Sequence, residues 1–209
     1  MNDIIILHIV SIIRIMVVLI ILFYINLPQF IKIILLIFSE GDCRIPRQLN
    51  LFSNPSQICP NTLIYHQTDK ISDTIIYSLL LFQIYNYNLL HKLDLKLVLY
   101  LFIYRLVGII LYFITQNRKY LIYFANFFLW ITLTIFIMKY FKKNYKNFLS
   151  IQHYKLIFTI VAGLKLIQEI FLHSGIKQDI KYAVFEKIAG MNYFSDETLV
   201  ILKDLFNIL

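Results

Sequence analysis

The residue pair with the clearest chemical potential is Asp69 and Asp73, at the point where a polar stretch of the chain meets an apolar one. On a helix the two carboxylates lie one turn apart on the same face, where their oxygens could share a divalent metal. A structural role suits the same residues, because Ser72 and Asp73 could cap the first amides of a helix. The sequence therefore makes this pair a catalytic candidate but assigns no metal site to it.

The run 69–73, Asp-Lys-Ile-Ser-Asp, is similar to the end of the signature of membrane CDP-alcohol phosphotransferases. Enzymes of that family use clustered aspartates and a metal to make phospholipids, so the resemblance implies such chemistry at Asp69 and Asp73. It covers only this run. The upstream Asp-Gly-x-x-Ala-Arg element is missing, and residues 41–44, Gly-Asp-Cys-Arg, do not match it. A small metal-dependent lipid-modifying enzyme is therefore an alternative function, and a non-catalytic role is favoured over it.

Arg105 lies at the centre of the apolar stretch 97–115, where a charge costs about 2.5–3.5 kcal/mol. Gly108 and Tyr112 share its helical face, so we expect this stripe to point into a bundle, with Gly108 admitting a close neighbour. The guanidinium could hold a lipid phosphate or an anionic substrate. It could instead fix the register between helices, through a salt bridge with a residue such as Asp73 or through a carbonyl contact. The sequence favours this second role.

Three further polar residues interrupt apolar stretches. Asn126 lies within 120–138, where a side-chain amide usually forms hydrogen bonds between helices. Lys165 and Glu169 lie within 156–172 at a spacing that allows them to pair along their own helix. A stretch with these charges either faces the interior of a bundle as it crosses the bilayer or lies flat on the membrane.

The two cysteines, Cys43 and Cys59, lie in a polar, proline-containing stretch, 39–72, whose composition indicates an irregular loop. They are far from the Cys-x-x-Cys spacing that is typical of redox dithiols. In an oxidising compartment we expect a structural disulfide, which would stabilise the loop by about 3 kcal/mol. Two unpaired thiols and a functional pair are the alternatives.

Long apolar stretches hold these residues, and each is close to the roughly 20 residues that a helix needs to cross a bilayer core about 30 Å thick. The chain is 59% hydrophobic, with a mean hydropathy of +0.70. The sequence therefore predicts an all-α, polytopic transmembrane helical bundle of four or five spans. The membrane domain is expected at 1–174 and a short amphipathic helical tail at 175–209. The expected spans are 3–25, 74–90, 97–115, 120–138 and, as the weaker fifth, 156–172.

Charged connectors predict the orientation of this bundle. The connectors 91–96 and 139–155 together contain more basic residues, all of them lysines, than the connectors 39–72 and 116–119. The positive-inside rule therefore places 91–96 and 139–155 in the cytoplasm. The stretch 3–25 is then a retained anchor with Arg14 near enough to its cytoplasmic half to snorkel. The run 30–38 is too short to cross, and we expect it at the interface or as an extension of the first helix after a kink.

No Walker A loop, GxGxxG, HExxH or GxSxG motif occurs in the sequence, so no cofactor is expected. The net charge of +8 lies mostly beside apolar stretches, where Lys and Arg meet anionic headgroups, and this placement argues against a nucleic-acid partner. We expect a multi-pass integral membrane protein that acts as a non-catalytic scaffold or accessory subunit. Its partners would be the lipid bilayer and other membrane chains or copies of itself. A transporter component is a further alternative.

Overall fold

The computed structural model describes residues 3–39, 63–117, 119–142, 145–151 and 153–173. The regular elements in these ranges are all helical, with no strand, as the sequence predicts. Cys43, Cys59 and the expected tail 175–209 lie outside the described residues, so the disulfide and the tail stay predictions. The elements in chain order are α1 (Asp3–Phe23), α2 (Gln29–Ser39), α5 (Leu63–Asn86), α6 (Lys92–Thr115), α7 (Lys119–Tyr123), α8 (Phe127–Phe141), the short 3₁₀ helix η1 (Phe148–Ser150) and α9 (Tyr154–His173).

Three helical segments are long and apolar enough to cross a membrane: Ile4–Phe23, Lys92–Thr115 and Lys119–Phe141. They correspond to the predicted stretches 3–25, 97–115 and 120–138. Their outward faces carry large exposed apolar side chains such as Ile12, Met16 and Ile114. A helix whose outer face is as apolar as its inner face suits a lipid environment, because lipid tails do not penalise exposed hydrocarbon.

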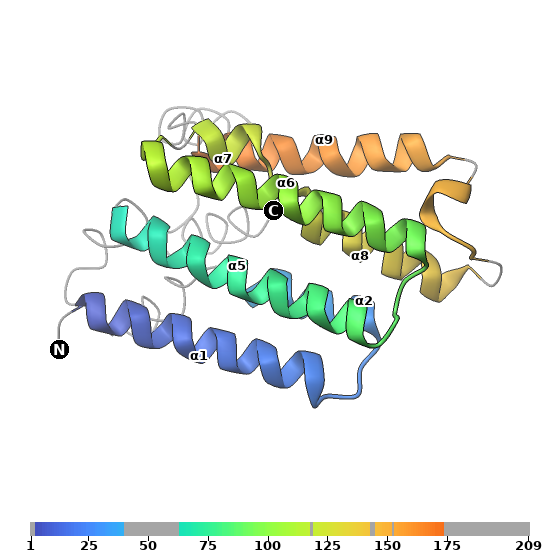
Figure 1. Ribbon diagram of the computed structural model, residues 1–209, viewed down its shortest axis with the longest axis horizontal. Helices are drawn as coiled ribbons and strands as arrows, with labels where there is room; N and C mark the ends of the chain where they lie inside the picture. The colour runs from blue at the N-terminus through green and yellow to red at the C-terminus, as the bar shows by residue number, and fades with distance from the viewer. Residues whose placement is uncertain (1–2, 40–62, 118, 143–144, 152, 174–209) are drawn as a thin grey trace, which may run out of the picture.

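One hydrophobic core joins most of the helices. Val18 of α1, Ile33 of α2, Leu80 of α5, Val98 of α6 and Ile131 of α8 are fully buried members of the same cluster. Phe148 of η1 belongs to it too. The aligned helices of this bundle are shown in Figure 1. The helices therefore bury their inner faces against one another and leave their outer faces apolar.

Helices α1 and α5 run side by side in the same direction (Figure 1). Tyr65, near the start of α5, packs on Ile6 and Leu7 near the start of α1. At the other end, the side-chain amide of Gln83 donates a hydrogen bond to the carbonyl of Leu22. The sequence analysis implies that the stretch 3–25 begins on the side opposite 39–72, whereas in the structure α1 and α5 begin at the same end of the bundle. The rest of the predicted grouping is kept, because α7 also begins at that end and α6 begins at the other.

Helix α2 makes this parallel arrangement possible because it turns back into the bundle after Pro28. The ammonium of Lys32 donates to the carbonyl of Leu22 at 2.8 Å, and the ring of Phe30 packs on Tyr140 of α8 at 4.9 Å between centroids. With 11 residues and a rise of 1.5 Å per residue, α2 is roughly half as long as a bilayer core is thick and is too short to cross it. The expectation that 30–38 extends the first helix is therefore wrong, because α2 is a separate helix packed against α8, and its position at the membrane interface stays a prediction.

This chain path predicts the labelling of single cysteines with a membrane-impermeant maleimide in sealed vesicles. In a background with both natural cysteines replaced by serine, Asn26→Cys and Tyr87→Cys should react from the same face of the membrane. Lys119→Cys should react from the opposite face, since α6 ends and α7 begins at the other end of the bundle. Labelling of Asn26→Cys and Lys119→Cys from one face would instead restore the orientation predicted from the sequence.

Candidate functional site

The candidate pair Asp69 and Asp73 lies inside helix α5, which begins at Leu63, well before the predicted start at 74. Both carboxylates are buried, as is Lys70 between them. The hydroxyl of Ser72 donates to the carbonyl of Thr68 at 2.9 Å and does not cap a helix start. The expectation of a capped helix start at this position is therefore wrong, because the preceding polar residues already belong to the helix.

A compact ionic network surrounds the two carboxylates. The guanidinium of Arg14 donates to Oδ1 of Asp73 at 2.7 Å, and its other terminal nitrogen lies 3.7 Å from Oδ1 of Asp69. The ammonium of Lys70 lies 2.6 Å from Oδ2 of Asp69 and 3.1 Å from Oδ2 of Asp73. Two cations thus neutralise two anions, as a buried site of low dielectric constant requires.

Arg14 behaves differently from what the sequence predicts. Its side chain is only 6% exposed, so it points into the bundle and does not snorkel to the interface. It also takes the position at Asp73 that the sequence analysis considered for Arg105. Because Arg14 lies near the middle of α1 and Asp73 near the middle of α5, their contact fixes the register of the two parallel helices.

Arg105 is buried in the middle of α6 and contacts backbone carbonyls. Its Nη1 donates to the carbonyl of Leu121 at 3.1 Å and to that of Phe124 at 2.6 Å. The hydroxyl of neighbouring Tyr104 donates to the carbonyl of Tyr123. These carbonyls lie at the end of α7, where intrahelical acceptors lose their partners. Of the two roles considered for Arg105, the contacts therefore match the carbonyl contact that fixes helix packing.

The predicted stretch 120–138 is two helices, α7 and α8, separated by a break at 124–126. Asn126, at the break, donates through Nδ2 to the hydroxyl of Tyr77 at 2.5 Å. The break packs closely against α6 at Gly108, since a Cβ atom at that position would lie 2.1 Å from Cβ of Phe124. The expected close approach at Gly108 is confirmed. The break itself has no signal in the sequence, because neither proline nor glycine occurs in 119–127.

Asp94 is a buried acidic residue that the sequence analysis missed. It is fully buried in the first turn of α6, where it accepts a hydrogen bond from the backbone amide of Phe148 at 2.7 Å and one from the hydroxyl of Tyr145 at 2.6 Å. Burial and the adjacent carboxylate raise the pKa of Tyr145 well above its usual range, so the hydroxyl stays a donor. Asp94 thus anchors the segment between α8 and α9.

The polar residues of α9 form a separate group. The side chain of Lys165 is buried, and its ammonium lies 3.0 Å from Oε1 of Gln168. The side chain of Glu169 lies outside the described residues, so the Lys165–Glu169 pair stays a prediction. The ion pairs of the network around Arg14 join it to Asp69, Lys70 and Asp73 and do not include Lys165 or Asn126.

The geometry of the ionic network favours structural stabilisation over metal chemistry. A metal shared by Asp69 and Asp73 would have to displace the ammonium of Lys70, which already contacts both carboxylates. Among the described residues, no cluster of three or more His, Cys, Asp or Glu side chains is placed to hold a metal ion. No protein-family model, curated protein or solved structure matches this chain.

The network predicts a large effect of removing one of its charges. Arg14→Leu should lower the free energy of unfolding by about 3–5 kcal/mol, because the two buried carboxylates would then share the single cation of Lys70 and leave one negative charge uncompensated. His8→Leu is the matched control, since His8 is an exposed residue of the same helix and its replacement should have little effect. Thermal unfolding of both variants in detergent measures the difference. Equal stability of the two variants would exclude a structural role for the network.

The close approach at the helix break gives a second prediction. Gly108→Ala should destabilise the protein by about 1–3 kcal/mol, because the added methyl group overlaps Phe124 and overpacks the contact. Gly163→Ala, in α9, meets open space and should be neutral or stabilising by up to about 1 kcal/mol through helix propensity. The same unfolding measurement tests both variants. A Gly108→Ala protein as stable as Gly163→Ala would show that α6 does not approach the break so closely.

Proposed function

We propose that this protein is a non-catalytic scaffold or accessory subunit of a membrane assembly. The observation that carries the proposal is the internal pairing of the buried charges on α1 and α5. Arg14, Asp69, Lys70 and Asp73 satisfy one another, and Arg105 is engaged with backbone carbonyls. Residues that would be reactive in an enzyme are here engaged in holding helices together.

We further propose that α5 and α9 cross the bilayer along with the three apolar segments, which gives five spans. The charges in the first half of α5 are buried against α1, whereas Ile71, Ile75 and Phe82 remain exposed on its outer face. Helix α9 exposes Leu156, Ile160, Leu164 and Ile167, which form one stripe at helical spacing. Apolar outer faces on both helices are compatible with lipid.

The outward face of α1 is the surface that best suits a partner helix. Helix α1 lies at the edge of the bundle, beside α5 and α2 (Figure 1). It exposes a continuous apolar stripe along its whole length, made of Ile5, Ile9, Ile12, Met16 and Ile20. In a membrane, such a stripe packs equally well against lipid or against another helix. A partner chain or a second copy of this chain could therefore dock there without burying any charge.

A transporter component is the second candidate, because α7–α8 is a broken helix beside the buried Arg105. Broken helices and charges at mid-membrane are typical of transporter binding sites. The enzyme alternative is less favoured, since Asp69 and Asp73 are both engaged with Lys70 and Arg14. Both alternatives require these charges to line an accessible cavity, whereas the pocket described below is apolar.

A photo-crosslinking amino acid at position 12, on the outward stripe of α1, tests the scaffold function in the native membrane. We expect one discrete protein adduct there, because a partner helix covers this stripe. The same label at position 114 of α6, where Ile114 is the more exposed side chain, is the control and should give lipid adducts. Lipid adducts alone at both positions would argue against the scaffold. Metal-dependent lipid synthesis by the purified chain, lost in a folded Asp69→Asn variant, would establish the enzyme.

A further inference from the structure

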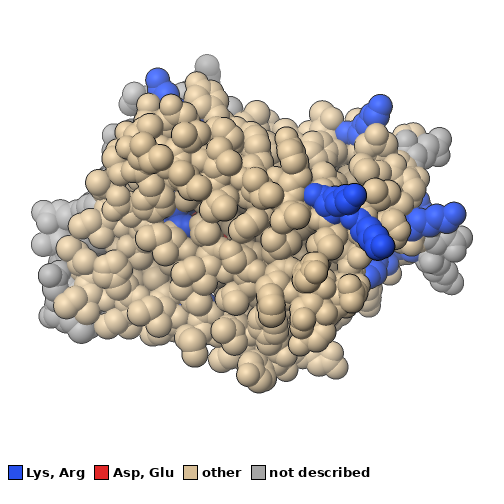
Figure 2. All heavy atoms as spheres, in the orientation of Figure 1, with Lys and Arg blue, Asp and Glu red and all other residues tan. Residues whose placement is uncertain are grey.

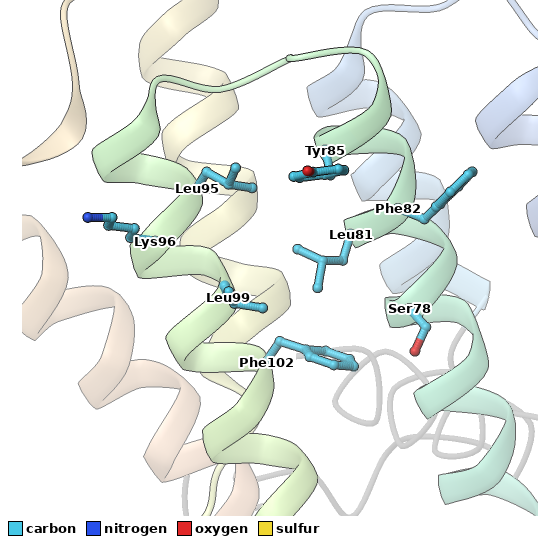
Figure 3. Close-up of a pocket in the computed structure, with 8 residues that line it drawn as sticks. All are labelled: Ser78, Leu81, Phe82, Tyr85, Leu95, Lys96, Leu99 and Phe102. Carbon is cyan, nitrogen blue, oxygen red and sulfur yellow. The ribbon is translucent and has the colours of Figure 1, made fainter.

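An apolar groove of about 420 Å³ opens between α5 and α6 on the outside of the bundle. Figure 3 shows it running from the level of Ser78 and Phe102 to that of Tyr85 and Leu95, next to the turn that joins the two helices. The lining also includes Leu81, Phe82 and Leu99. Tyr85 and Phe82 are more than half exposed, so the groove is open along its side. Its volume lies within the roughly 300–1,000 Å³ of typical ligand sites.

The mouth of this groove lies at the positively charged end of the protein. Lys92 and Lys96, in the first turns of α6, are exposed. The ammonium of Lys139 donates to the carbonyl of Leu89, which places a third exposed lysine at the α5–α6 turn. Figure 2 shows that Lys and Arg side chains gather at this end of the visible face. Three exposed lysines thus lie near the end of the apolar groove that is next to the α5–α6 turn.

Acidic side chains do not offset this charge on the described surface. The three acidic residues whose burial is described, Asp69, Asp73 and Asp94, are all buried. Asp94 is the one at the lysine-rich end, and its two oxygens accept hydrogen bonds from Tyr145 and Phe148. The lysines at the mouth therefore keep their attraction for an anion.

We propose that this groove binds one anionic phospholipid, with an acyl chain between α5 and α6 and the phosphate at Lys92 and Lys96. The occupant should combine a long apolar part with an anionic head, because one end of the apolar groove lies near exposed lysines. In Figure 3 the Lys96 ammonium points away from the groove, but it is exposed on a flexible four-carbon stem that can turn toward a headgroup. Tyr85 lies at the same end of the groove as Lys96, and its amphipathic ring is typical of residues at a membrane interface.

The orientation of the protein supports the choice of an anionic lipid. The lysine-rich end is the one that the positive-inside rule places in the cytoplasm, and the cytoplasmic leaflet carries the anionic lipids. A lysine near such a surface contributes about 1 kcal/mol, or roughly five-fold in affinity. The proposed lipid site rests on the membrane placement proposed above. The quenching experiment has one outcome that contradicts the lipid site and a different one that contradicts the membrane placement.

Quenching of a single tryptophan by brominated lipids tests the site in the full-length protein. In a Trp130→Phe background, Leu99→Trp places the reporter in the groove, Tyr140→Trp places it at the same basic end outside the groove, and Ile114→Trp places it at the far end of α6. Vesicles contain phosphatidylcholine and phosphatidylglycerol in equal amounts, with one or the other brominated. We expect the preference for brominated phosphatidylglycerol to be several-fold larger at position 99 than at position 140.

Replacing Lys92 and Lys96 with glutamine should remove this excess preference at position 99 and leave position 140 unchanged. Equal preference at positions 99 and 140 would overturn the site, because general attraction of anionic lipid to the basic end would explain the data. Retention of the preference in the glutamine variant would overturn the role of the two lysines. If neither brominated lipid quenches the reporter at position 114, the membrane placement fails, and the groove proposal fails with it.

Discussion

The contact on which the arrangement of this bundle depends is the buried ion pair between Arg14 and Asp73. Arg14 is far from both ends of α1 and Asp73 is inside α5, so their 2.7 Å contact sets how the two helices lie along each other. A charge in an apolar interior is tolerated only with a partner and good geometry. The pairing sets the register of α1 and α5, whereas contacts at their two ends, Tyr65 with Leu7 and Gln83 with Leu22, show that the helices are parallel.

A second constraint is the need to satisfy carbonyl groups where a helix is interrupted inside an apolar bundle. The end of α7 leaves acceptors that a lipid environment cannot satisfy. Arg105 and Tyr104 of α6 donate to them, and Asn126 connects the same break to Tyr77 of α5. An isolated charge on α6 and an interruption of the next helix are thus each costly alone but stabilise each other when they pack together.

Charge is distributed in two distinct ways in the described part of the chain. On α1 and α5 the buried charges are balanced and engaged with each other, whereas at the α5–α6 turn the exposed lysines have no exposed acidic neighbour among the described residues. A neutral interior favours a stable bundle over a reactive centre. An uncompensated cationic end, next to an apolar groove, favours recognition of anionic lipid at the surface of the bundle.

The sequence by itself determined the helical class, the three apolar membrane-length segments and the close approach at Gly108, because hydropathy and small-residue spacing are local properties. It also identified Arg105 as a residue whose charge needed a partner and Asp73 as one possible partner. Only the tertiary structure decided which partners they have, since one carboxylate can pair with any cation that the fold brings near. The early start of α5, the reversal at α2 and the break at 124–126 were likewise decided by packing, which overrides local propensity when distant residues satisfy buried polar groups.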